Sequence, residues 1–540
     1  MTAIGRRAKP QTSAVGESVR SYVRSSQATE DVLVFGAVVL THAVLAYALA
    51  FVWEIWQVET LARTASAQAV FWSRDPHLTA IGFALNPLQT VLQLPLVLVR
   101  PLASIGIAGP IVSLIAGGVG AVFLLRAVRS LGVSRPLSFL FLAAAAAMPL
   151  MLFSATNGAA DAAFVAATWA ATYYFIRAER ERENVQPLAL LGVAIGAAFL
   201  ARPEGIVLVA LGLLAVMVGE YSRRSSQPKV EGLAVAYLVM PVYVVTLWVL
   251  ANWLVSGDPL AFVAGQTPRS FEAEFLPAEV RSLVGRPLDA LRYVGETLWA
   301  VSPLFFVAGA PVLLWALVRR SLVAVFVLAI WASVPLLQVV LLTAGLSFGA
   351  TRSFIFAIPG GIAAAAIAFG WASRSPGVVA SVVRVVVVLA VALSPIAAWV
   401  LLPELADERP YLDALAGRPV SESPGFARRD SALIAAIDAL DGPILVDTAT
   451  HPALVLGVAQ PSKLVVPSDR DFGAILANHS ARYLLVPRPR GTGLLDAVNA
   501  QYPRLYGGGE SWAVFERDFP VSGLRLYRIR TADAAGAPRP

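Results

Sequence analysis

The sequence has no cysteine, few histidines and little charge. Without cysteine, neither disulfides nor thiolate metal sites contribute to the fold. The histidines show no spacing typical of zinc ligands; they are His42, His77, His451 and His479. Charged residues make up only 14% of the 540 positions, whereas a soluble domain carries about a quarter. This low charge excludes an ordinary soluble protein.

Long apolar runs take the place of charge. Hydrophobic residues make up 57% of the chain, and apolar runs of about 18 residues or more, each long enough to cross a bilayer, recur from Asp31 to about Leu402. We predict a polytopic all-α membrane bundle with about eleven transmembrane helices. The expected spans are residues 32–52, 107–127, 137–155, 159–177, 187–201, 205–220, 232–254, 298–317, 322–343, 353–371 and 378–402. The segment 88–104 is ambiguous, because its prolines and its arginine also suit a helix lying in the membrane interface.

The distribution of basic residues predicts the orientation. The formal net charge is +7, but the basic residues lie mainly in short turns between spans, so we expect no nucleic-acid partner. The basic turns contain Arg126, Arg129 and Arg135; Arg177, Arg180 and Arg182; Arg223, Arg224 and Lys229; Arg319 and Arg320; and Arg374. The positive-inside rule places these turns and the N-terminal tail in the cytoplasm. An odd number of spans then leaves the C-terminal part outside a plasma membrane.

The pattern changes near Pro403. Apolar runs shorten to strand length at 443–447, 463–467, 482–487, 511–516 and 524–529, and they alternate with helix-like stretches at 431–440, 470–479 and 493–502. This alternation predicts a small α/β domain. We therefore expect a cytoplasmic tail (1–31), a transmembrane domain (32–402) with outer loops 53–106 and 255–297, and an extracytoplasmic α/β domain (403–540). No glycine-rich phosphate loop follows the first strand, and Asp447 at its end suits either a ligand or a helix cap.

The first outer loop holds the most conspicuous charges. Glu59 lies about two helical turns beyond Val52, where the first span is expected to leave the hydrocarbon. A carboxylate there can accept a proton from a hydroxyl group if burial raises its pKa. The structural alternative is an ordinary ion pair with Arg63, four residues later on the same helical face.

A second polar group follows in the same loop, Arg74-Asp75-Pro76-His77. An aspartate before proline suits a turn or a helix start. The functional alternative makes Asp75 a second acid, with Arg74 and His77 as partners of a phosphate.

Five further candidates face the same compartment. Asp161 starts a span, where it compensates the helix dipole, and Arg202 and Glu204 are close enough to neutralise each other. Asp258 lies in a turn at the start of the second outer loop. Arg352 enters a span from its outer end, where it either extends to the interface or binds an anionic lipid headgroup.

Several segments carry a family resemblance. These are ETLARTASAQAVFWSRDPH running into NPLQTVLQLP, then FLARPEG, VSGDPLAFVAGQ and TRSFIFAIP. In their order and predicted topology they resemble the GT-C superfamily, the integral-membrane glycosyltransferases related to protein O-mannosyltransferases and aminoarabinose transferases. The resemblance spans the membrane part, from Asp31 to Leu402.

The resemblance implies an inverting hexosyl- or pentosyltransferase that uses a polyprenyl-phosphate-linked sugar donor at the outer leaflet. The acceptor would be an envelope glycan, lipid or protein. The first-loop acid would be the general base, which is Glu59 by position. Such families usually carry aspartate there, so Asp75 is the alternative by residue type. The donor phosphate would be held by Arg352, with Arg202 second.

Two rival functions and one cofactor stay open. A lipid or glycan transporter would place ionisable groups near the bilayer midplane, whereas the predicted span centres carry little charge. A catalytically silent scaffold of envelope assembly is the second rival, since glutamate replaces the usual aspartate. Glu59, Asp75 and Asp161 offer oxygen ligands for a divalent cation, but no feature of the sequence requires a metal.

Overall fold

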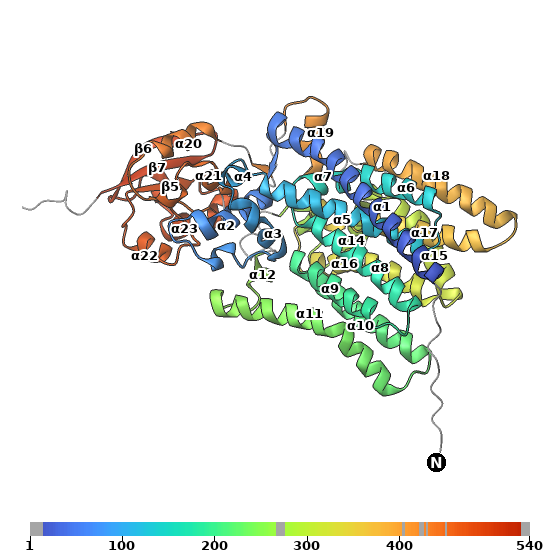
Figure 1. Ribbon diagram of the computed structural model, residues 1–540. Helices are drawn as coiled ribbons and strands as arrows, with labels where there is room; N and C mark the ends of the chain where they lie inside the picture. Colours follow the sequence, from blue (N-terminus) through green and yellow to red (C-terminus); the bar gives the residue numbers. More distant parts are fainter. Residues whose placement is uncertain are drawn as a thin grey trace, which may run out of the picture.

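A helical bundle and a small mixed sheet lie at opposite ends of the molecule (Figure 1). The computed structural model describes residues 14–265, 276–401, 406–420, 426–427, 430–448 and 451–530. The sheet lies at the left of the view, next to the segments of the first outer loop, and the bundle occupies the right.

All eleven segments expected to span the membrane are helical, but the count of eleven spans is not confirmed. In the described part of the chain, seven helices are long and apolar enough to cross a membrane, or up to nine spans if each of two bent pairs counts as one. The seven are α1 (Ala14–Tyr47, continued by a π-helical turn, Ala48–Val52), α5 (Ala108–Ser130), α10 (Gly205–Ser222), α11 (Gln227–Ser256), α16 (Leu322–Thr343), α17 (Ala357–Arg374) and α18 (Val378–Leu401). Two expected spans are less typical: α9 (Gln186–Ala201) has only 16 residues, and α8 (Asp161–Arg180) contains polar residues that lower its apolar character.

Two expected spans are interrupted by a proline. Helices α6 (Arg135–Ala147) and α7 (Pro149–Thr156) meet at 73°, and α14 (Pro287–Val301) and α15 (Leu304–Val318) meet at 112°. In each case the residue before the proline is out of the helical conformation, with ψ of 132° at Met148 and 92° at Ser302. Steric conflict with the proline ring disfavours helical geometry at that position, so the break is set locally by the sequence.

Aromatic side chains fill the centre of the bundle. Trp169 of α8 lies 4.7 Å from Trp331 of α16, measured between ring centroids, and Trp331 lies 5.0 Å from Phe356 at the start of α17. These rings are at most 1% exposed. They pack α8, α16 and the start of α17 against one another; α8 begins at Asp161, and Arg352 lies just before α17.

The first outer loop is built from short elements. The first span ends at Val52, and a new helix, α2 (Val58–Trp72), begins after strand β1 (Trp56–Gln57), so Glu59 lies in the first turn of a separate helix. A 3-10 turn (Leu78–Ile81), α3 (Leu88–Val97) and α4 (Arg100–Ser104) follow. With 10 residues, α3 is too short to cross a bilayer, which favours the interfacial alternative for 88–104.

The expected α/β pattern of the C-terminal part is observed. Five strands form a sheet in the order β4-β3-β5-β7-β6, parallel among β4, β3 and β5 and antiparallel at β7 and β6. The strands are β3 (Ile444–Leu445), β4 (Leu464–Val465), β5 (Tyr483–Pro487), β6 (Ala513–Phe519) and β7 (Leu524–Ile529). Helix α20 (Ser431–Asp438) precedes them, and α21 (Pro452–Gly457), α22 (Phe472–Ala477) and α23 (Ala497–Gln501) lie between them in the chain. The Asp447 carboxylate accepts a hydrogen bond from the N–H of Ala497, the first residue of α23, at 2.8 Å. Of the two roles considered for Asp447, this contact corresponds to the helix cap.

The first outer loop packs directly against the C-terminal part. Strand β1 pairs with β2 (Phe426–Ala427). The Gln68 amide donates to the Val455 carbonyl at 3.3 Å, and the Arg100 guanidinium donates to the Val458 carbonyl at 2.9 Å. The α2 helix therefore contacts both the bundle and the α/β part.

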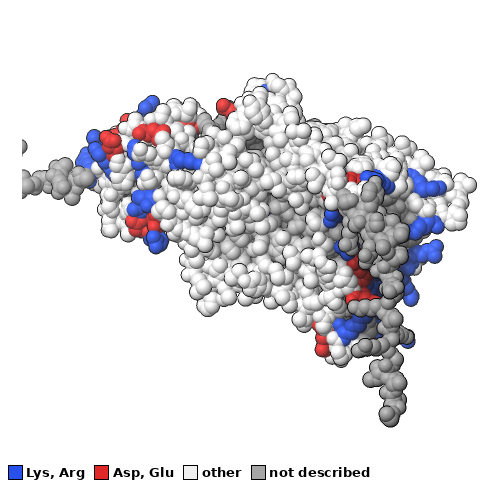
Figure 2. Space-filling model, viewed as in Figure 1, with Lys and Arg blue, Asp and Glu red and all other residues white. Residues whose placement is uncertain are grey.

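Charge gathers at the two ends of the molecule. Figure 2 shows lysine, arginine and acidic side chains on the α/β part and at the opposite end of the bundle, with a broad uncharged surface between them on this face. An uncharged band between two charged ends is the surface that a membrane-spanning protein needs. The protein is a multi-pass membrane protein.

Candidate active site

The site begins at the first turn of α2. A carboxylate in this position is favoured by the positive end of the helix dipole, and Glu59 occupies it. One turn later, Arg63 Nε donates to Glu59 Oε1 at 2.9 Å, as the spacing predicts. The second arm of the Arg63 guanidinium donates to the Asn86 carbonyl at 2.6 Å. Arg63 thus fixes the carboxylate relative to the start of α3.

A second guanidinium reaches the same carboxylate from far along the chain. Arg352 lies in a 3-10 turn (Thr351–Phe354) just before α17, and its Nη1 contacts Glu59 Oε2. The Arg352 side chain is 38% exposed and the Glu59 side chain 16%. Both oxygens of Glu59 are therefore paired, and Arg352 is the partner open to an incoming ligand.

Three other candidates form an ion triad nearby. Arg202, between α9 and α10, contacts Asp161 at the start of α8 and pairs with both oxygens of Glu204. The three side chains are at most 12% exposed. Together with Glu59, Arg63 and Arg352, the ion-paired groups are three arginines and three carboxylates, so these six groups are neutral together when all are ionised.

The two acids are held ionised by their partners. Burial alone would raise the pKa of Glu59, but attraction to Arg352 and Arg63 outweighs it and holds the pKa well below the usual range. Burial and Arg202 oppose each other in the same way at Glu204, and the pKa of Glu204 is lowered. Despite its burial, Arg202 has a raised pKa because Glu204 and Asp161 stabilise its charge.

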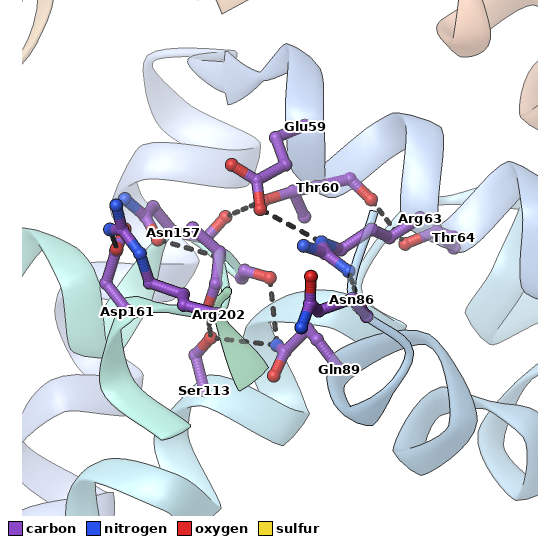
Figure 3. Close-up of polar contacts among 12 residues, drawn as sticks. Glu59, Thr60, Arg63, Thr64, Asn86, Gln89, Ser113, Asn157, Asp161 and Arg202 are labelled. Atoms are coloured by element: carbon purple, nitrogen blue, oxygen red, sulfur yellow. Dashed lines mark hydrogen bonds and ion pairs between the residues drawn. The ribbon is translucent and has the colours of Figure 1, made fainter. Parts of the chain in front are cut away.

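A layer of neutral hydrogen bonds supports these ions (Figure 3). Thr60 Oγ1 donates to the Asn157 carbonyl at 2.7 Å, and the Gln89 amide donates to the Gly158 carbonyl at 2.9 Å. Gly158 has φ of +84°, and a Cβ there would lie 2.4 Å from Thr60 Cγ2. Only glycine fits this approach of α2 to the turn before α8.

Four sequence candidates lie elsewhere. Arg74 pairs with Asp469 at 3.2 Å and with Asp471, and Asp75 pairs with Arg470. Hydrogen bonds from Arg470 lower the pKa of Asp75.

The other two of these candidates make local contacts. His77 Nδ1 lies 3.7 Å from the Asp75 carboxylate. Asp258 accepts a hydrogen bond from the Leu260 N–H at 2.9 Å in an exposed turn. The structure therefore joins the SRDPH turn to the α/β part and brings Glu59, Asp161, Arg202, Glu204 and Arg352 together.

Sequence reasoning missed two acids beside Arg352. Asp407 accepts hydrogen bonds from the Thr351 N–H at 2.9 Å and from Thr351 Oγ1 at 3.3 Å. Glu408 is 6% exposed, and burial raises its pKa to about 8. Both follow the last span by a few residues, and no motif in the sequence connects them with the first outer loop. Asn86 and Gln89 were also missed as site residues, although they open the expected juxtamembrane helix.

The oxygen ligands considered for a metal do not converge. Glu59 is paired with two arginines, Asp161 with Arg202, and Asp75 with Arg470. Within the described ranges, no group of three or more histidines, aspartates and glutamates is arranged to hold a metal ion.

Comparison with known proteins identifies the fold. Residues 103–248 match the family described as dolichyl-phosphate-mannose-protein mannosyltransferase. The chain is similar in structure to ArnT from Cupriavidus metallidurans in the apo state, with a TM-score of 0.54 and 15% identity over 95% of this chain and 100% of ArnT. For ArnT bound to undecaprenyl phosphate the TM-score is 0.55, with 14% identity over 94% of this chain and 100% of ArnT. No curated protein matches the sequence. The expected resemblance to the GT-C superfamily is confirmed, and the fold is ArnT-like.

Proposed function

We propose that this protein is an inverting glycosyltransferase that moves a hexose or pentose from a polyprenyl-phosphate-linked donor to an envelope glycan, lipid or protein at the outer membrane face. The observation that carries the proposal is the direct contact between Glu59 and Arg352, which joins a carboxylate and an accessible guanidinium in one site. The family match and the ArnT-like fold support it, since a solved ArnT structure holds undecaprenyl phosphate.

The proposed reaction is a single displacement at the anomeric carbon. The acceptor oxygen forms a bond to that carbon while the bond from carbon to the phosphate oxygen breaks. The acceptor proton passes to Glu59, and the leaving polyprenyl phosphate carries away the electron pair. Arg352 compensates the charge that develops on the phosphate. Attack opposite the leaving group inverts the anomeric carbon.

The pairing of Glu59 suggests an order of events. A carboxylate held by two guanidinium groups is a weak base, because both stabilise its ionised form. A donor phosphate that attracts Arg352 would leave Glu59 with Arg63 alone and raise its pKa. In this scheme, binding of the donor strengthens the base that the acceptor needs.

The remaining candidates take supporting roles in the proposal. Arg202 already pairs with Asp161 and Glu204, so it is less available to a phosphate than Arg352. Asp75 stays the alternative base, and its pairing with Arg470 would have to open before it could act.

The proposed orientation places the α/β part outside and the N-terminus in the cytoplasm. The basic turns lie together at the end of the bundle far from the sheet: Arg126 and Arg129 contact Asp31 and Glu30, and Arg223 contacts Glu179. The positive-inside rule assigns that end to the cytoplasm. The Glu59–Arg352 site then faces the outer compartment of the plasma membrane.

Turnover in lipid tests the proposal. Purified protein in nanodiscs is incubated with a panel of polyprenyl-phosphate-linked hexoses and pentoses and with a cell-envelope extract as the source of acceptors, and release of polyprenyl phosphate is measured for wild type, Glu59→Gln and Asp75→Asn. Glu296→Gln is the matched control, since Glu296 pairs with an arginine four residues away on an exposed face. We expect loss of turnover only in Glu59→Gln. Wild-type turnover unaffected by either loop substitution would refute the base assignment, and failure of wild type to bind or cleave any donor would refute the function.

A further inference from the structure

The segment that follows the last span returns to the candidate site. A 3-10 turn (Ala406–Glu408) packs against the turn that carries Arg352, and Asp407 accepts two hydrogen bonds from Thr351. Because Arg352 follows Thr351 and Glu408 follows Asp407, this contact brings the two neighbours into the same region. Arg352 and Asp161 both act electrostatically on Glu408.

Glu408 is buried without a partner of its own. The residue is 6% exposed, and its carboxylate makes no hydrogen bond or ion pair with any other residue that the structure describes. The charged and titratable groups that face it are Asp407, Asp161, Arg352 and Tyr411. Tyr411 is fixed by stacking on Phe153, with 4.3 Å between ring centroids. A buried acid without a partner favours its neutral form.

The charge state of Glu408 decides how much of the Arg352 charge is compensated. With Glu408 neutral, Glu59 is the one ion-pair partner of Arg352 among the described residues. With Glu408 ionised, a second carboxylate would compete for the same guanidinium, in a poorly solvated place where Coulomb attraction is strong.

We propose that Glu408 is a positioning residue that acts through Arg352. Its neutral form leaves the guanidinium available to the phosphate of the lipid-linked donor, and its ionised form pairs with the guanidinium in competition with that phosphate. This inference rests on the proposed function, because it takes Arg352 as the ligand of the donor phosphate.

The expected effect is a loss of donor binding as the pH rises. With a pKa of about 8, about nine-tenths of Glu408 is neutral at pH 7 and about one-tenth at pH 9. If the ionised form binds no donor, affinity falls about tenfold between these values. The other facing groups do not produce this change: the pKa of Tyr411 is raised above its usual range by burial, and the pKa of Glu59 is lowered.

Equilibrium binding tests the proposal without turnover. The full-length protein in nanodiscs of zwitterionic lipid is titrated with a polyprenyl methyl phosphodiester at pH 6.5, 7.5, 8.5 and 9.5. A phosphodiester is the suitable probe, since a phosphate monoester has a second ionisation near pH 6 that would confuse the profile. The variants are Glu408→Gln, which is neutral at every pH, and Asp413→Asn, which removes a carboxylate that pairs with Arg418 on the same segment.

The outcomes separate this inference from the proposed function. We expect wild type and Asp413→Asn to lose about thirtyfold in affinity between pH 6.5 and pH 9.5, with the midpoint near pH 8, and Glu408→Gln to bind equally at all four values. Wild-type binding that is independent of pH, or a Glu408→Gln profile that falls like wild type, overturns the role of Glu408 and leaves the proposed function intact. Absence of phosphodiester binding by wild type at every pH refutes both.

Discussion

Replacing Glu59 by glutamine tests whether Glu59 is the general base or only a binding residue. The substitution keeps the shape of the side chain, and its amide oxygen can still accept the hydrogen bond from Arg63. It removes the proton acceptor, however, and general-base catalysis is worth about 10²–10⁴-fold in rate. We therefore expect kcat to fall by about this factor.

The charge of the site predicts that the donor KM does not increase in Glu59→Gln. Three arginines face three carboxylates in wild type, and glutamine at position 59 leaves three against two. The extra positive charge lies on Arg352 and Arg63, beside the expected phosphate. Donor KM should stay the same or decrease while kcat falls, a split that loss of donor binding does not produce.

Stability needs a separate control in this variant. Breaking a fully buried ion pair costs about 3–5 kcal/mol. The Arg352 side chain is 38% exposed and can turn to solvent, so we expect a smaller loss. Thermal unfolding in detergent measures the loss of stability. The kinetics of wild type and variant are then compared at a temperature well below the lower of their two unfolding midpoints. A kcat within about threefold of wild type, or an increase in donor KM that accounts for the whole effect, would refute Glu59 as the base.

Three further predictions concern the support of the site and the α/β part. Gly158→Ala should destabilise the protein by about 2–3 kcal/mol more than Gly257→Ala, because both have positive φ but only the first Cβ meets other atoms; equal thermal shifts would contradict this. Arg74→Ala should lower the free energy of unfolding by about 1–3 kcal/mol, since it leaves the fully buried Asp469 carboxylate with less compensation; a shift within about 0.5 kcal/mol, as expected for a surface change, would contradict it. Burial and a neighbouring aspartate raise the pKa of Asp496 from 3.8 to about 7, so its stabilisation is complete below about pH 4 and is lost as the pH rises to about 7. In wild type, the hydrogen-exchange protection of the sheet should therefore decrease over this pH range, and Asp496→Asn should remove most of the decrease. The same pH profile in wild type and variant would contradict this prediction.

Local rules account for most of the secondary structure. The apolar runs predict the long helices of the bundle, although most of α14 lies in the segment expected as the outer loop 255–297, and the short alternating runs predict the five strands of the α/β part. The prolines at 149 and 303 explain why two of the runs are bent. The number of spans does not follow from the apolar runs alone, because a 16-residue helix such as α9 can be shielded by its neighbours and does not need the length that an isolated span requires.

The sequence does not determine which charged residues pair when they lie far apart in the chain. Asp75 lies about 395 positions before Arg470, and its own neighbours suit a turn, a base or an ion pair equally well. Glu408 lies in a short polar segment with no periodicity, so its return to Arg352 depends on how the last span and the following turn pack. Charge complementarity limits the possible partners but does not select among the many arginines of this chain.

Glu59 shows why the structural and functional alternatives for one residue are not exclusive. The spacing to Arg63 predicts an ordinary ion pair, and that pair is present. The same pair holds the carboxylate in place while a second, more exposed arginine contacts its other oxygen. A base that must stay ionised and oriented until a substrate arrives needs such a partner, because an unpaired carboxylate at this depth would become protonated or mobile. The local Glu59–Arg63 pair is therefore part of the proposed catalytic arrangement. The contact that distinguishes a catalytic carboxylate from an ordinary ion pair is the one with Arg352, which only the folded chain brings to Glu59.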